Sequence, residues 1–235
     1  LERLGISTES TAETLNALTN SFQMSAREAM QTQERVAALA TQLGIPPQEM
    51  ANSYRSALPQ LAQFGTRATE IFEGLAAQAK ATGIAVNELV GFVDKFDTFE
   101  QAAETTGKLN AMLGGNLLNS IDLLTAEGPE RLDLIRQALD QSGQSFAELD
   151  RFAQKSIASI VGLPVDKARA MFETTNQEIM NARNAANSSS AAIANLNEKI
   201  QAATSFQDKW RLATEAFAVA AMPLLQILTN VVQTI

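Results

Sequence analysis

Four short segments of the chain share a pattern that ends one helix and begins the next. Each has a glycine, then an apolar residue and then, in three of the four, Ser or Pro; the glycines are Gly5, Gly44, Gly83 and Gly162. Glycine readily adopts the left-handed conformation that ends helices, and Ser or Pro favours a helix start. This punctuation predicts many short helices joined by tight corners.

The spacing of these glycines leaves two interpretations open. The first three are 39 residues apart, which fits a weak helical repeat. The same spacing fits a helical protein that ends its helices with the commonest cap and has no repeat. We favour the second interpretation.

Composition supports a helical fold and removes several kinds of chemistry. The chain has 39 alanines among 235 residues, with 12 glycines, 6 prolines and 6% aromatic residues. Alanine is the best helix former, so we expect an all-α fold. The chain has no cysteine and no histidine, which excludes disulfides, zinc–thiolate sites, His-dependent triads and thiol nucleophiles.

The caps and apolar periodicity place the helices along the chain. We predict them at 7–22, 25–42, 47–57, 60–81, 85–95, 98–112, 116–124, 129–141, 145–159, 165–203 and 206–234. They group into an acidic multi-helix array over 1–165, a long coiled-coil-like helix over 166–205, and an apolar amphipathic terminal helix over 206–235. The fold class expected is therefore an array of short helices followed by two long ones.

Charge is distributed unevenly between these parts. Residues 1–165 hold 20 acidic and 12 basic residues, while residues 166–235 hold six of each, so the whole net charge of −8 lies in the array. Binding to a phosphate backbone requires clustered Lys and Arg. We therefore expect no specific nucleic-acid binding.

A heptad pattern runs through the last 70 residues and predicts self-association. Apolar residues recur seven apart from Ile179 onwards, and the phase slips by three across 204–206. The pattern is typical of a coiled coil, although a local helical hairpin would show the same periodicity. The predicted oligomer seam consists of Ile179, Ala186, Ile193, Leu196, Ile200, Trp210, Phe217, Leu224, Ile227 and Val231.

The final twenty residues carry no charge, since Glu215 is the last charged residue. That length is enough to cross a bilayer as a helix. One face of this helix is an uncharged polar stripe of Gln226, Thr229, Asn230 and Gln233. In a bundle or coiled coil the stripe would set the register, and in lipid it would face partner helices or a wet lumen.

Two carboxylate pairs and one glycine pair are the candidates for chemistry. Asp94 with Asp97, and Glu127 with Glu130, have the residue types of a carboxylate hydrolase, but solvated helix ends and caps explain them better. Gly114-Gly115 has no following lysine and no preceding strand, so a helix C-cap followed by an Asn116 cap is a better explanation than a phosphate loop. We expect no catalytic, metal or cofactor site.

Several blocks of the chain resemble tail tape measure proteins of tailed bacteriophages. The main block is FDTFEQAA at 96–103, continued by KLNAMLGG at 108–115 and LNSIDLLT at 118–125. FAQKSIA at 152–158 also resembles this family, and LGIPPQEM at 43–50 is similar to the helical arrays of its members. The resemblance covers most of residues 40–235, and its motifs are packing motifs.

The resemblance implies a long, mostly helical virion protein inside the tail tube. Some members of that family carry a peptidoglycan-cleaving insert, but this sequence shows none, so we expect no enzyme. Such proteins help to set tail length, act as homo-oligomers (often trimers), and leave the tube ahead of the DNA to engage the host envelope. Tail tube and baseplate hub proteins would be its partners, and a host membrane a further one. Residues 1–165 break too often for a straight ruler helix. The sequence departs from the family's ruler in this respect, so we expect this segment to lie beyond the ruler, near the tail tip.

Two other classes of protein remain as alternatives. The chain could be a soluble helical interaction module whose terminal helix closes a bundle. An enzyme is the least favoured class, because its site would have to be built from carboxylates alone. The chain begins with Leu1 and shows no signal-peptide pattern, so we expect it to be a piece of a longer protein.

Overall fold

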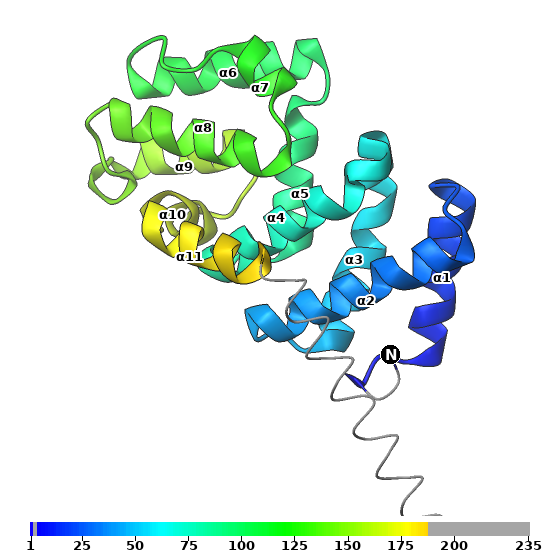
Figure 1. Cartoon of the computed structure of the whole chain (residues 1–235). Coiled ribbons are helices and arrows are strands. Elements are labelled where there is room, and N and C mark those ends of the chain that lie inside the picture. Colours follow the sequence, from blue (N-terminus) through cyan, green and yellow to red (C-terminus); the bar gives the residue numbers. More distant parts are fainter. Residues whose placement is uncertain (2–3, 188–235) are drawn as a thin grey trace, which may run out of the picture. The chain divides into compact units, whose positions relative to one another are not determined.

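The computed structural model describes residue 1 and residues 4–187, and this part of the chain is all-helical with no strand. Figure 1 shows the order of its elements. These elements are α1 (Thr8–Ser21), α2 (Ala26–Leu43), α3 (Pro47–Leu61), η2 (Ala62–Arg67), α4 (Ala68–Thr82), α5 (Val86–Val93), η3 (Asp94–Phe96), α6 (Phe99–Leu113), α7 (Ser120–Thr125), α8 (Gly128–Gln141), η4 (Phe146–Glu148), α9 (Arg151–Val161), α10 (Val165–Glu173) and α11 (Asn176–Asn187).

The glycine pattern ends helices as predicted. Gly44, Gly83 and Gly162 follow α2, α4 and α9 with φ of 63°, 72° and 77°. The apolar residue after the glycine is buried at two of these corners, where Ile84 is 2% and Leu163 6% exposed. These two corners therefore return the chain towards the core at the point where a helix ends.

The predicted capping box at the start of α2 is confirmed. The Ser25 hydroxyl accepts from the backbone N–H of Glu28 at 3.3 Å, and the Glu28 carboxylate accepts from the backbone N–H of Ser25 at 2.8 Å. Two N–H groups that a helix start leaves unpaired are thereby satisfied. This box separates α2 from α1, as the sequence predicts.

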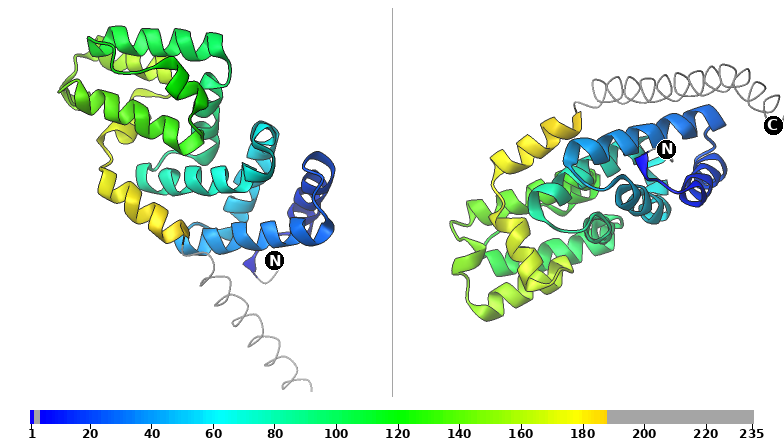
Figure 2. Two further views of the ribbon diagram at one scale, coloured as in Figure 1. Left: turned by 45° about the horizontal axis from the view of Figure 1, so that its top comes forward. Right: turned by 90° about the horizontal axis from the view of Figure 1, so that it is seen from below.

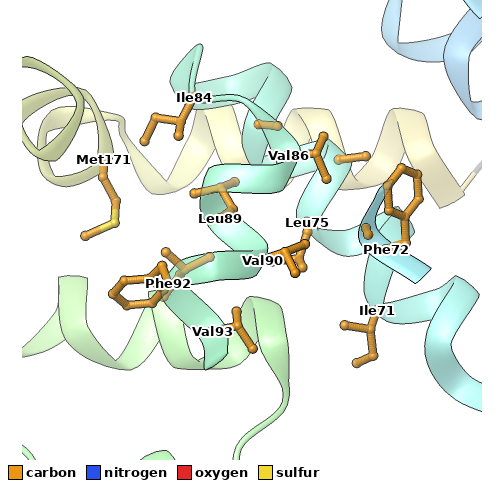
Figure 3. Packing of buried hydrophobic residues seen from close by; sticks show 14 of the residues in the cluster. Ile71, Phe72, Leu75, Ile84, Val86, Leu89, Val90, Phe92, Val93 and Met171 are labelled. Carbon is orange, nitrogen blue, oxygen red and sulfur yellow. The ribbon is translucent and has the colours of Figure 1, made fainter. Parts of the chain in front are cut away.

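The core is centred on α4 and α5, which contact one another and the helices before and after them. Figure 3 shows Phe72, Leu75, Leu89 and Phe92 packed in this region, all at most 1% exposed. The ring of Tyr54 on α3 meets that of Phe72 edge to face at 4.8 Å. Burial of these aromatic and branched side chains stabilises the packing of the short helices.

Two glycines allow α4 and the start of α8 to approach closely. A Cβ built on Gly74 would lie 2.5 Å from Cγ of Pro129, and one on Gly128 would lie 2.9 Å from Cγ2 of Ile71. Real Cβ atoms do not come so close to neighbouring carbon atoms. Glycine is therefore required at both positions by packing rather than by backbone conformation.

Two predicted helix boundaries differ from the structure, one at a proline and one at a glycine. The helix predicted at 47–57 continues through Pro59 to Leu61. A proline this near the end of a helix removes few backbone hydrogen bonds, and the burial of Leu58 and Leu61 at 3% and 1% exposure favours the extra turn. Gly65, with φ 53° and ψ −126°, breaks the predicted helix at 60–81 into η2 and α4.

The continuous helix predicted at 165–203 is wrong within the described residues. α10 ends at Glu173 and α11 begins at Asn176. The sequence has no glycine or proline here, but Thr175 and Glu178 form a capping box that starts a new helix. α10 packs on α9, and α11 packs on α4 and α2, within one compact unit that starts at Leu1 (Figure 2).

The remaining part of the predicted coiled coil, from 188 to 205, and the terminal helix at 206–235 lie outside the described residues.

Candidate functional site

One buried arginine on α8, Arg131, joins the ends of α5 and α7 to the start of α8. The Arg131 side chain is 4% exposed. Its guanidinium donates to the carbonyl oxygens of Val93 at 2.7 Å and Leu124 at 3.2 Å, and Nε donates to that of Ala126 at 2.9 Å. It also donates to Asp97 Oδ1 at 2.5 Å. Arg131 therefore pairs the ends of α5 and α7 with the start of α8.

The carboxylates Asp94 and Asp97 belong to this structural cluster. Asp97 accepts from Arg131 and, through Oδ2, from the Gln63 amide at 2.7 Å. Burial raises the pKa of Asp94, the neighbouring Asp97 raises it further, and Arg131 lowers it. Both oxygens of Asp97 are thus engaged in holding η2, η3 and α8 together.

The second carboxylate pair starts a helix. The Glu130 carboxylate accepts from the backbone N–H of Glu127 at 3.3 Å, in a capping arrangement at the start of α8. The Glu127 carboxylate forms an ion pair with Arg67. Within the residues that the structure describes, no group of three or more His, Cys, Asp or Glu could hold a metal ion.

The block that carries the family resemblance folds into a corner between α6 and α7. Gly114 ends α6 with φ 78°, and Asn110 organises the loop that follows. The Asn110 side chain accepts from the N–H groups of Leu117 and Leu118 at 3.1 and 2.9 Å and donates to the Leu118 carbonyl at 2.8 Å. One amide therefore makes three backbone hydrogen bonds and fixes the loop.

This loop corrects the predicted start of the next helix. The cap is Asn119 rather than Asn116, because the Asn119 side chain accepts from the N–H of Ile121 at 2.9 Å. Asn110 holds residues 117–118 outside any helix, so α7 begins at Ser120 instead of at residue 116. The interpretation of Gly114 as a helix C-cap is confirmed.

A polar hollow lies at this corner, and three large apolar side chains are exposed on α6, α7 and α9. The hollow measures about 490 Å³, and its lining includes Thr106, Gly107, Asn116, Asn119 and Asp122. Phe99 on α6, Ile121 on α7 and Phe152 on α9 are 65%, 56% and 74% exposed. α6 packs against both α7 and α9. Singly exposed apolar side chains are ordinary on protein surfaces, so these three do not by themselves define a binding site.

The predicted oligomer seam is only partly within the described residues. Ile179 and Ala186 lie on α11 and are buried, at 3% and 5% exposure, where α11 packs on α4 and α2. The other predicted seam residues are outside the described part of the chain: Ile193, Leu196, Ile200, Trp210, Phe217, Leu224, Ile227 and Val231. The polar stripe of Gln226, Thr229, Asn230 and Gln233 is outside it too.

Arg131 is the structural residue that inspection of the sequence missed. It shares a helical stripe with Ile135, Ala138 and Leu139, at spacings of four, seven and eight residues. Those spacings place one face of a helix towards the core. A charged residue on such a stripe indicates a buried ion pair, and this signal was available in the sequence.

Among residues 1 and 4–187, no helix is both long and apolar enough to cross a bilayer. Comparison of the chain with known protein families, with characterised proteins and with solved structures finds no match.

Proposed function

We propose that this chain is a non-enzymatic structural segment of a phage tail tape measure protein, which works by helix packing. The observation that carries the proposal is the resembling block at 96–125. Its residues serve packing, because Asn110 fixes the corner between α6 and α7 and Asp97 pairs with the buried Arg131. An all-helical array with these packing motifs is compatible with a scaffold role.

The proposed setting is the lumen of the tail tube near the tail tip. There the segment would contact tube and baseplate hub proteins and form a homo-oligomer, with a trimer favoured, through residues 166–235. On ejection it would leave ahead of the DNA, and residues 206–235 would engage the host envelope. The motivating features are the heptad pattern and the charge-free end after Glu215.

One observation favours the alternative of a helical interaction module. Ile179 and Ala186, at the start of the predicted seam, are buried inside the described unit. A chain that hides these residues in its own core has less surface for self-association in the folded form. In this alternative the terminal helix completes the bundle and does not meet a membrane.

The test uses Trp210, the only tryptophan of the chain. Its fluorescence is measured with and without anionic phospholipid liposomes, beside the molar mass from light scattering. The tape measure proposal predicts an oligomer whose emission shifts to shorter wavelength with lipid, because Trp210 would enter a less polar environment. A monomer with unchanged emission would contradict it and favour the module.

Two matched double variants test whether the apolar face of residues 206–235 is responsible for self-association and lipid binding. Leu224→Asp with Ile227→Asp places two charges on the apolar face and should abolish self-association or lipid binding. Thr229→Asp with Gln233→Asp places the same two charges on the polar stripe and should have the smaller effect. Equal effects of the two pairs would mean that the apolar face has no special role.

A further inference from the structure

Two carboxyl groups lie next to each other at the corner between α5 and α6. Asp94 begins the 3-10 helix η3 and Asp97 is its C-cap, where the backbone N–H of Asp97 donates to the Asp94 carbonyl at 3.3 Å. Side chains three residues apart eclipse one another in a 3-10 helix. Both residues are partly buried, and the Asp97 side chain is 19% exposed. Water therefore screens the repulsion between the two carboxylates only in part.

One cation serves both carboxylates of this pair, and most of its hydrogen bonds are made elsewhere. An arginine side chain has five N–H donors. Arg131 uses four of them, one on Asp97 Oδ1 and three on backbone carbonyls. Its charge also acts on Asp94, where it lowers the pKa. When both carboxyl groups are ionised, the pair therefore carries one more negative charge than Arg131 neutralises.

The other elements around Asp94 do not offset this charge. α3, α4 and α8 pack on α5, and among the described residues the charged groups that act on the Asp94 carboxyl are Asp97 and Arg131. The side chain of Lys95, the next residue, extends over Gly162 at the end of α9. Where two carboxyl groups share a site, one of them holds its proton to higher pH, because both cannot ionise without repulsion.

We propose that Asp94 and Asp97 form a pH-sensitive switch, which holds the corner between α5 and α6 on α8 most firmly when the pair binds one proton. With this proton, the Asp94 carboxyl donates to Asp97, while Asp97 keeps its hydrogen bonds with Arg131 and Gln63. As the pH rises the proton leaves, and two adjacent negative charges weaken the contact that Arg131 makes. The switch belongs to the described helices and does not depend on the tape measure assignment.

The direction of the pH effect follows from the pKa of Asp94, which burial and Asp97 raise. In the unfolded chain an aspartate has a pKa of about 3.9. Between this value and the folded one, the folded state binds more protons than the unfolded state. The contribution of the pair to the free energy of unfolding is therefore fully present below about pH 4 and is lost as the pH rises through the folded pKa.

Asp94→Asn tests the switch, because the amide keeps a hydrogen-bond donor for Asp97 and never carries a charge. Urea unfolding is compared with the native chain at about pH 4.5 and about pH 7.5. We expect the variant to raise the urea midpoint at the higher pH, where the native pair has lost its proton, and to change it little at the lower pH. Burial also raises the pKa of Glu73, but Glu73 is present in both proteins and cancels in the comparison.

Asp140→Asn is the matched control, because Asp140 is exposed near the end of α8. It should shift the midpoint equally at the two pH values. A midpoint shift by Asp94→Asn that is equal at both pH values, or downward at the higher one, would overturn the switch.

Two local measurements on the native chain place the effect at the corner. Carbon NMR of the Asp94 carboxyl should give a titration midpoint above about pH 4. Amide exchange at Asp97, corrected for the intrinsic rate, should become faster at the higher pH, and Asp94→Asn should remove this change. An ordinary midpoint for Asp94, or an exchange rate at Asp97 that responds to pH in the same way in both proteins, would contradict the proposal.

Discussion

Gly74 on α4 and Pro129 on α8 pack so closely that no larger side chain fits at position 74. A Cβ there would lie 2.5 Å from Pro129 Cγ. The proline ring is fixed to the backbone at the start of α8 and cannot rotate away. We predict that Gly74→Ala lowers the free energy of unfolding by about 1–3 kcal/mol, the usual cost of overpacking, measured by denaturant unfolding.

Gly91→Ala is the matched control for this change. Gly91 also lies within a helix, α5, but a Cβ there would meet no atom within 4 Å. Alanine is the better helix former by roughly 0.5–1 kcal/mol, so this variant should be stabilised. If both variants changed stability in the same direction, contact with Pro129 would not be what selects glycine at position 74.

The second prediction concerns the buried arginine of α8. Arg131→Met should destabilise the chain by about 3–5 kcal/mol, because it leaves Asp97 with one charge partner fewer and three carbonyl oxygens unpaired. Urea unfolding measures the change. Arg55→Met removes an ion pair whose partners are 39% and 48% exposed, and it should cost less than about 1 kcal/mol. Similar losses would show that Arg131 acts as an ordinary surface cation.

Helix ends are predicted best from the sequence where a single residue type determines the backbone conformation. Gly44, Gly83 and Gly162 end their helices because each takes positive φ, and glycine alone does this without strain. The break at Thr174 was missed because Thr175 and Glu178 can either cap a helix or lie inside one. Contacts with Arg136, distant in sequence, stabilise the capped form, and such contacts leave no local periodic signal.

The candidate site was less predictable than the helices for the same reason. Nothing in the sequence marks Phe99, Ile121 and Phe152 as exposed, yet the structure exposes them at 65%, 56% and 74%. Which apolar positions face outward depends on how many helices cover them, and that is fixed only when the corners are formed. The polar hollow, whose lining includes Asn116 and Asn119, likewise depends on the loop that Asn110 holds.

The third prediction tests that loop. Asn110→Ala should leave the N–H groups of Leu117 and Leu118 and the carbonyl of Leu118 without their partner, at a cost of about 1–3 kcal/mol. Amide hydrogen exchange at residues 117 and 118 should become faster, while exchange at Ile84 should change little. Asn87→Ala, at an exposed position on α5, is the control. Unchanged exchange at 117 and 118 would mean that Asn110 does not fix the loop.

The fourth prediction uses Tyr54, the only tyrosine of the chain. Burial raises its pKa to about 12, although the hydrogen bond with Thr69 at 2.9 Å lowers it. In the unfolded chain the pKa should be near 10. Between these values the unfolded state binds fewer protons than the folded state, so the free energy of unfolding falls as pH rises above about 10.

Absorbance of the tyrosinate ion near 295 nm measures this directly. In the folded protein it should appear only around pH 12, and in urea around pH 10. Tyr54→Phe keeps the ring that packs edge to face on Phe72 and removes the ionising group. This variant should therefore lose that part of the alkaline destabilisation, because no phenol remains to be deprotonated on unfolding. A folded-state tyrosinate signal at pH 10 would show that Tyr54 reaches water, which contradicts its position at 1% exposure in the core.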